Sequence, residues 1–205
     1  MRIEDERAHF DADTDLREPV GVSFLGRLPW LILLFGLGML VSSVASLFEE
    51  IISHLSVIVA FQSLVLGMAG NVGTQSLAVT IRALTEGNLT AKRTRRLVLR
   101  ETGMGFCGGV VLGSLSFLLI GSYLHWIKGV GGQLAFSVSL CTGLALVFAM
   151  LLSGFAGSVI PLLCKRLHID PAVASGPFIT TVNDLVAVVA YYGLAWLLLI
   201  RGIGN

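Results

Sequence analysis

The sequence predicts an all-α membrane protein with five transmembrane helices. Hydrophobic residues make up 55% of its 205 residues, charged residues make up only 13%, and the mean hydropathy is +0.85. A soluble domain of this length is not expected to be so apolar. Five apolar stretches are each long enough to cross a hydrocarbon core of about 30 Å, and short polar segments separate them.

Residues 1–27 form a polar segment ahead of the first apolar stretch. Its seven acidic and four basic side chains favour a solvated leader or a short surface helix. An acidic and polar start of this length does not have the pattern of a cleavable signal peptide. We therefore expect a polar cytoplasmic tail at 1–27 and a five-helix membrane domain at 28–201.

The first two predicted helices cover about residues 28–52 and 55–84. Trp30 stands where the first apolar stretch begins, which suits the boundary between lipid and water. The second stretch stays free of charge until its last turn. Between the two helices, Glu49 and Glu50 form an acidic turn that could recruit cations at the membrane surface.

The third and fourth predicted helices cover about residues 97–124 and 133–164. In the third helix, glycine recurs at every fourth position, at Gly105, Gly109 and Gly113. Small residues at this spacing let the backbone of another helix come close within a membrane. We therefore expect this helix to pack tightly on a neighbour.

The fifth predicted helix covers about residues 171–200. Asp170 can cap its start, and Pro171 suits the first helical position because no backbone N–H is needed there. Further along, Pro177 removes one hydrogen bond of the helix and frees a carbonyl of the preceding turn. This segment therefore offers backbone oxygens as well as side chains to a ligand.

Asp184 is a carboxylate inside an apolar stretch. In a regular helix it lies about 21 Å from Asp170 and near the same face. Three further residues fall near that face: Pro177, Thr180 and Thr181. A charged side chain at the centre of a bilayer costs at least about 2.5 kcal/mol. A bound cation, a bound proton or a basic partner must offset this cost, and the predicted helices offer no lysine or arginine at that depth.

The second predicted helix carries a polar stripe. Asn71 and Gln75 are four residues apart and share a face, and Thr74 is adjacent. Glycines such as Gly70 remove side chains from the same helix and expose its backbone. Hydrogen bonds between helices would explain the stripe about as well as ligand binding, because they are common in membranes.

The distribution of basic residues predicts the orientation of the chain. Of the 14 lysines and arginines, all but Lys128 and Arg201 lie in the tail, the loop after the second helix or the turn after the fourth. By the positive-inside rule, the N-terminus is cytoplasmic and the C-terminus is outside the cell (inner) membrane. Asp170 then lies at the cytoplasmic mouth, with Asp184 about half-way across. The net charge of +1 gives no reason to expect a nucleic-acid partner.

The available ligand atoms favour a hard cation. Carboxylate, amide, hydroxyl and carbonyl oxygens suit Mg²⁺, Ca²⁺ or Mn²⁺. Because Mg²⁺ usually keeps several of its waters, it needs few direct protein ligands. Two Asp184 carboxylates from symmetric copies would repel each other unless a cation lay between them.

Three motifs occur in order along the chain: NVGTQ at 71–75, R-x-x-x-R-E-x-G at 96–103, and DPAVASGPFITTVND at 170–184. With these motifs, roughly residues 25–200 resemble the transmembrane domain of MgtE-type magnesium channels. The resemblance implies a homodimer with five helices per protomer, a cytoplasmic N-terminus and a pore on the two-fold axis. Typical bacterial members also carry a cytosolic helical domain and CBS domains that sense Mg²⁺, where this sequence has its 27-residue tail.

The resemblance also implies roles for individual residues. Asp184 is expected to bind largely hydrated Mg²⁺, with Asn71 nearby and Asp170 at the cytoplasmic mouth. Residues expected to line the pore around them are Gly70, Thr74, Gln75, Pro177, Thr180, Thr181 and Asn183.

We therefore expect a channel or facilitative transporter for a divalent cation, most readily Mg²⁺, and no enzyme. The residues do not rank Mg²⁺ against Mn²⁺, Co²⁺ or Ca²⁺. Exchange coupled to protons or Na⁺ remains open. A second alternative that remains open is a membrane subunit that needs a separate soluble regulatory chain. Such a chain could dock on the basic segment 92–100, and anionic lipid could bind the same segment. An aspartyl hydrolase is not expected, because Asp170 and Asp184 of one chain lie too far apart to act together.

Overall fold

Helices account for nearly all of the chain that the computed structural model describes, which is residues 19–49, 53, 56–87, 89–168 and 176–200. The helices are α2 (Val20–Ser46), α4 (Ser56–Thr85), α5 (Ala91–Ser122), α6 (Gly132–Arg166) and α7 (Gly176–Ala195), with π-helical turns η1 (Tyr123–Ile127) and η3 (Trp196–Ile200). No strand occurs in these described ranges. The predicted all-α fold class is confirmed.

Five helices are long and apolar enough to cross a membrane, which is the predicted number. Two of them begin earlier than the sequence predicts, α2 at Val20 and α5 at Ala91. The first residues of α5 are polar and basic. A helix can continue through such residues beyond the lipid. Its backbone hydrogen bonds are made within the helix itself, so they persist when the surroundings change from lipid to water.

The chain divides within α2 into two compact units, one ending at Leu37 and the other starting at Gly38. In the part of α2 that belongs to the first unit, large apolar side chains such as Phe24 and Ile32 are exposed. A helix that is apolar all round and exposed in this way has the surface of a span that faces lipid.

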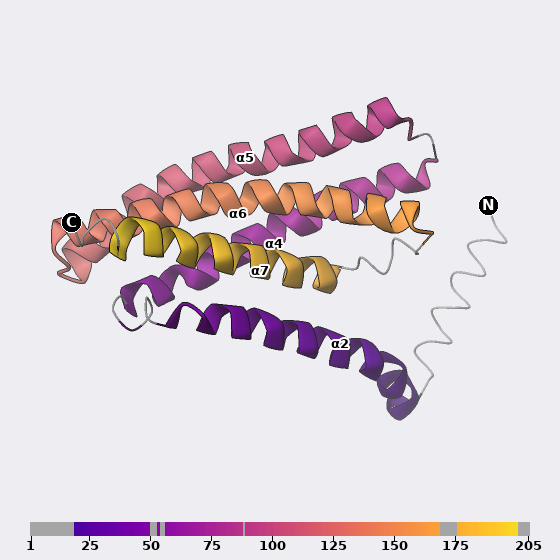
Figure 1. The fold of residues 1–205 in the computed structure, drawn as a ribbon, viewed down its shortest axis with the longest axis horizontal. Coiled ribbons are helices and arrows are strands. Elements are labelled where there is room, and N and C mark those ends of the chain that lie inside the picture. The colour runs from indigo at the N-terminus through magenta and orange to yellow at the C-terminus, as the bar shows by residue number, and fades with distance from the viewer. Residues whose placement is uncertain (1–18, 50–52, 54–55, 88, 169–175, 201–205) are drawn as a thin grey trace. The chain divides into compact units, whose positions relative to one another are not determined.

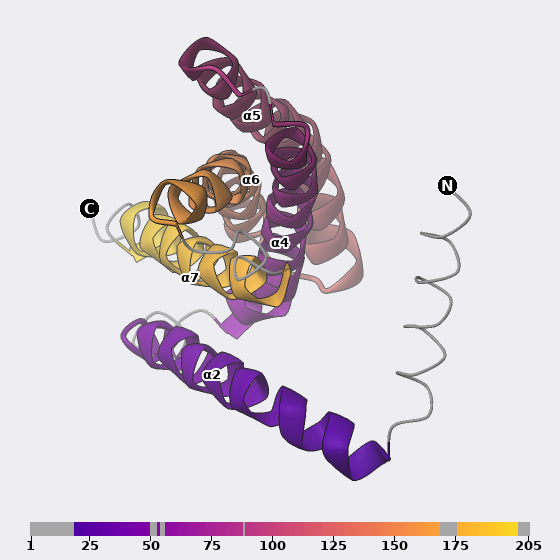
Figure 2. The same ribbon diagram turned by 90° about the vertical axis from the view of Figure 1, so that its right-hand side faces the viewer.

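In the second unit, α6 is the central helix. It packs against α5 along most of its length, and it also contacts α4 and α7 (Figure 1). Figure 2 shows α4 running beside α6 and α7, the two helices against which it packs. Because the connections are short, α4, α5, α6 and α7 run in alternating directions, so the end of α4 and the start of α5 lie at the same end of the unit as the end of α6 (Figure 1).

The contact between α5 and α6 depends on missing side chains. A Cβ atom on Gly109 would lie 2.7 Å from the Cα of Val147, and one on Gly113 would lie 2.6 Å from the carbonyl oxygen of Gly143. These distances are too short for real Cβ atoms, so both backbones approach as closely as glycine permits. The tight packing expected for the third predicted helix is found, and its partner is α6.

Two tyrosines fasten α7 to α4. The hydroxyl of Tyr191 donates a hydrogen bond to the carbonyl oxygen of Ile58 at 2.7 Å, and that of Tyr192 donates to Oε1 of Gln62 at 2.6 Å. Phe48, just after α2, stacks on Tyr192 with ring centroids 5.7 Å apart. Because buried tyrosines combine a large apolar ring with a directed hydroxyl, these contacts set the position of α7 along α4.

We expect Gly109→Ala to destabilise the protein, because the new methyl group meets the backbone of α6. Overpacking of this kind typically costs about 1–3 kcal/mol. The thermal midpoint of the purified protein in detergent should fall. The matched control is Gly103→Ala on the same helix, where a Cβ atom meets nothing within 4 Å, and its midpoint should not fall. Equal midpoints for the two variants would contradict the close packing of α5 on α6.

Candidate cation site

A hollow of about 380 Å³ lies between α4 and α7. Its lining residues come from one face of each helix: Ser63, Leu66, Gly67, Gly70, Asn71 and Thr74 from α4, and Thr180 and Asp184 from α7. Asp184 is the one charged residue among them. The structure therefore brings three of the predicted pore-lining residues, Gly70, Thr74 and Thr180, together with Asn71 around the predicted carboxylate.

The helical repeat explains why these residues share the hollow. On α7, Thr180 and Asp184 are four residues apart and so lie on one face. On α4, two glycines lie on the face that meets them. A Cβ atom on Gly70 would be 3.4 Å from Cγ2 of Thr180, whereas one on Gly67 would meet nothing within 4 Å. The helices thus touch at Gly70, and the space beside Gly67 stays open with its backbone accessible.

Asp184 is half-buried in this hollow and has no basic neighbour there. Within the described part of the chain, its carboxylate makes no hydrogen bond and no ion pair. Of the three ways to offset a carboxylate inside a membrane, a basic partner is therefore not found among these residues. A bound cation and a bound proton are the two that the geometry leaves.

The threonine hydroxyls around Asp184 present oxygen lone pairs to the hollow. Thr74 Oγ1 lies 3.0 Å from the carbonyl oxygens of both Gly70 and Asn71, to which it can donate. Thr180 Oγ1 donates to the carbonyl oxygen of Gly176 at 2.9 Å. Because each hydroxyl proton is directed to the backbone of its own helix, the remaining lone pairs can accept hydrogen bonds from water. The site is suited to a cation surrounded by water.

Four predicted pore residues lie outside this lining: Gln75, Pro177, Thr181 and Asn183, of which Asn183 is described below. Gln75 and Pro177 are exposed, and neither contributes to the hollow. Thr181 is half-buried, and its hydroxyl donates to the carbonyl oxygen of Pro177 at 2.9 Å. For these residues a pore-lining role stays a prediction.

The acids predicted at the two ends of the path are not part of the hollow. Glu49 is exposed just beyond α2. Asp170 and Glu50 lie outside the described residues. Their expected roles in recruiting or releasing cations stay predictions.

Asn183 takes a place unlike that of its neighbour Asp184. Its side chain is completely buried, and it occupies the space that a Cβ atom on Gly73 would need. Its amide has no hydrogen-bond partner among the described residues. A Cβ atom on Gly157 of α6 would in turn collide with the carbonyl oxygen of Gly73. Asn183 therefore packs where three helices meet, while Asp184 lines the hollow.

Three lining residues were missed by sequence reasoning: Ser63, Leu66 and Gly67. The polar stripe that the sequence shows runs forwards from Asn71 to Gln75, but the hollow continues backwards from Gly70. The spacing of Ser63, Gly67, Gly70 and Thr74, at intervals of four and three, is the signal that could have identified this face.

Comparisons with known proteins identify a family and several relatives of this chain. The model of the MgtE family, described as divalent cation transporter, matches residues 62–194. The chain is 41% identical to the magnesium transporter MgtE of Enterococcus faecalis and 37% identical to that of Bacillus subtilis, each over 82% of its length. It is 34% identical to that of Thermus thermophilus over 86% of its length. These matches span only 35%, 36% and 37% of the respective relatives.

We expect Gly73→Ala to separate α7 from α4, because the new methyl group needs the space of the Asn183 amide. The thermal midpoint should fall, by an amount typical of overpacking, about 1–3 kcal/mol. Asn183→Ala in the same chain should recover much of this loss, since it empties that space. The two substitutions should therefore be strongly non-additive in a double-mutant cycle. Additive losses would show that the two residues do not compete for one place.

Proposed function

Because the chain belongs to the MgtE family of divalent cation transporters, we propose that it forms the membrane path of a divalent cation transporter, with Mg²⁺ as the preferred ion. One observation supports this most strongly. Asp184 is a carboxylate inside an apolar helix, and it faces a hollow that offers oxygen atoms and no basic side chain. A passing cation supplies the charge that such a carboxylate needs.

In this proposal, Asp184 holds a largely hydrated ion. Each copy of the chain supplies only one carboxylate, which is too few ligands to replace the waters of the ion. Mg²⁺ also gives up its waters reluctantly, so most of them stay bound. The waters would donate hydrogen bonds to the oxygens of Asn71, Thr74 and Thr180 and to backbone carbonyls near Gly67. Oxygen ligands discriminate among cations by cavity size and hydration, so Mn²⁺, Co²⁺ and Ca²⁺ are the competitors to test.

The same chemistry supports a homodimer with its pore on the two-fold axis. In one copy, Asp184 is only half-buried, so its exposed side would meet lipid if nothing covered it. A second copy would cover it and add a second carboxylate, and together they would balance the charge of a divalent ion. The pair is stable only with a cation between the two acids, because like charges oppose joint ionisation.

The orientation in this proposal follows from the basic residues. The end of the second unit where α4 gives way to α5 carries Arg82 and the basic residues from Lys92 to Arg100, and α6 ends there with Lys165 and Arg166. By the positive-inside rule this end faces the cytoplasm. Asp170 would then guide the ion on the cytoplasmic side, and Glu49 and Glu50 would attract it outside.

We expect Asp184→Asn to abolish Mg²⁺ transport while the protein still folds. The amide keeps the shape of the side chain and removes its charge, so Mg²⁺ flux into phosphatidylcholine liposomes should fall at least about tenfold, a loss of about 1.4 kcal/mol or more in ion stabilisation. The thermal midpoint should be unchanged or higher, since an uncompensated charge leaves the membrane interior.

The matched control for flux is Glu86→Gln, which neutralises an acid outside the hollow. It should transport at the rate of the parent protein. Flux measured without any proton or Na⁺ gradient, across a panel of Mg²⁺, Mn²⁺, Co²⁺ and Ca²⁺, separates a channel from a coupled exchanger. Normal flux in the Asp184→Asn protein would overturn the proposed site.

We expect Asp184→Cys to be cross-linked into a dimer by a short bismaleimide reagent, in a chain whose three cysteines are replaced, because the proposal places residue 184 of the two copies across one axis with a hydrated ion between them. A direct disulfide would be too short to span that ion, so the linked species should appear on denaturing gels after treatment of the protein in liposomes with the reagent. Val189→Cys, an exposed position on the same helix, is the matched control and should not be cross-linked. Equal cross-linking of the two variants would argue against a pore at this axis.

A further inference from the structure

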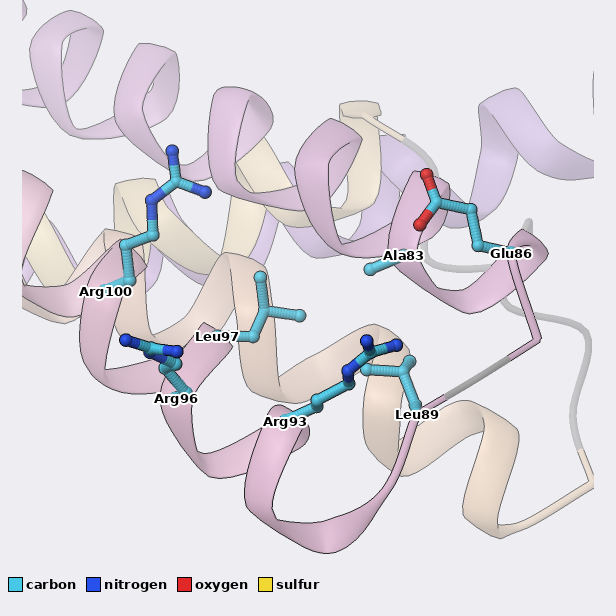
Figure 3. A pocket seen from close by; sticks show the side chains of 7 residues that line it. All are labelled: Ala83, Glu86, Leu89, Arg93, Arg96, Leu97 and Arg100. Atoms are coloured by element: carbon cyan, nitrogen blue, oxygen red, sulfur yellow. The ribbon is translucent and has the colours of Figure 1, made fainter.

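A second hollow, of about 580 Å³, lies where the end of α4 meets the start of α5 (Figure 3). We call it the arginine pocket, and its lining residues are Ala83, Glu86, Leu89, Arg93, Arg96, Leu97 and Arg100. It shares no residue with the cation site between α4 and α7. The proposed transport function does not use it.

The local fold places three arginines along one side of this pocket. Gly87, with φ of +77°, allows the chain to turn after α4. Thr90 then begins α5, and its hydroxyl oxygen accepts a hydrogen bond from the backbone N–H of Arg93 at 3.4 Å. Arg93, Arg96 and Arg100 follow at intervals of three and four residues, so they share one face of the helix.

The charge of the pocket is strongly positive. Figure 3 shows the three guanidinium groups arranged along α5 and the carboxylate of Glu86 across from them, just beyond α4. Three positive charges thus stand against one negative charge among the lining residues. Arginine is the side chain best suited to phosphate, because its planar fork can donate two parallel hydrogen bonds to two oxygens.

The position of the pocket distinguishes a lipid from a soluble anion. The face of α5 that carries the three arginines turns apolar one helical turn after Arg100, where Met104 is 64% exposed. Leu89 and Leu97 lie among the arginines in the lining itself. A free anion would contact only the guanidinium groups. A phospholipid would contact them with its phosphate and the apolar side chains with its acyl chains.

We propose that the arginine pocket is a binding site for the phosphate of an anionic phospholipid headgroup. Basic residues next to a transmembrane helix attract anionic lipids through their charge alone, at about 1 kcal/mol for each residue near the surface. The pocket adds shape to this attraction. Orientation in the membrane depends only on the number of basic residues on each side. Three arginines on one face, with Leu89 and Leu97 among them, form a place for one headgroup.

The neighbouring basic residues provide a matched control. Lys92 and Arg95 belong to the same first turns of α5 and carry the same charge, but they do not line the arginine pocket. Arg96→Gln with Arg100→Gln removes two charges from the pocket, and Lys92→Gln with Arg95→Gln removes two charges beside it. A diffuse electrostatic attraction would be weakened equally by both pairs.

The experiment is a titration of the purified full chain in detergent with phosphatidylglycerol or phosphatidylcholine, read out by native mass spectrometry. We expect the parent protein to retain one phosphatidylglycerol per chain in preference to phosphatidylcholine. The Arg96→Gln, Arg100→Gln protein should bind phosphatidylglycerol about 10- to 30-fold more weakly, because the phosphate loses its charge-assisted hydrogen bonds to two guanidinium groups. The control pair should keep its bound lipid, and Glu86→Gln should bind more tightly because the opposing charge is gone.

Several results would overturn the proposal. Equal loss of phosphatidylglycerol binding in both double variants would indicate a diffuse electrostatic attraction and not a defined pocket. Equal retention of phosphatidylglycerol and phosphatidylcholine would show that the headgroup needs no net negative charge. Competition by inorganic phosphate or glycerol 3-phosphate at the concentration of the lipid would indicate a site for free anions. Preferred retention of polyglutamate would indicate an acidic polypeptide instead. Arg96→Lys with Arg100→Lys keeps the charge of the pocket. If this variant binds the lipid more weakly while its thermal midpoint equals that of the parent protein, the loss concerns binding and not folding.

Discussion

A carboxylate inside a membrane must be neutralised by something other than hydrocarbon, and the arrangement of α4 and α7 depends on this constraint. Asp184 meets no basic side chain in the described chain, so its environment offers the oxygen atoms of neighbouring residues in place of a fixed counter-charge. A permanent ion pair would remove the cost of the charge but would also occupy the carboxylate. Leaving the counter-charge to a mobile cation keeps the site available to the ion that the protein is proposed to carry.

Such a site requires rigid helices, because the hollow contains few contacts that could hold it open. The rigidity comes from elsewhere. Glycines bring α5 onto α6, and Tyr191 and Tyr192 fasten α7 to α4 by hydroxyl groups that lie outside the hollow. The adjacent residues Asn183 and Asp184 have different roles. Asn183 packs where three helices meet, and Asp184 lines the hollow. In membranes, where lipid is as apolar as a protein core, such close packing and hydrogen bonding are the main forces between helices.

The molecule carries two polar features of opposite sign, and each suits a different partner. The hollow at Asp184 is acidic and lies among apolar stretches, where a small hydrated cation can neutralise it. The arginine pocket is basic and lies where α5 changes from polar to apolar, where phosphate and acyl chains occur together. Because the two hollows share no residue, loss of lipid binding and loss of ion transport can be measured as separate effects.

The sequence alone determined the five helices, the all-α class and the carboxylate at Asp184, because hydropathy over some twenty residues and a charge within such a run are local properties. It did not determine which face of α4 meets α7. Asn71 lies next to the face that continues to Gln75 and also next to the face that carries Gly70. The tertiary structure selected the face of Gly70 and Gly73, where the side chains of Thr180 and Asn183 of α7 come close to the backbone of α4. It also sent Asn183 inwards and Asp184 into the hollow, since neighbouring residues of a helix point about 100° apart and packing decides which one is buried.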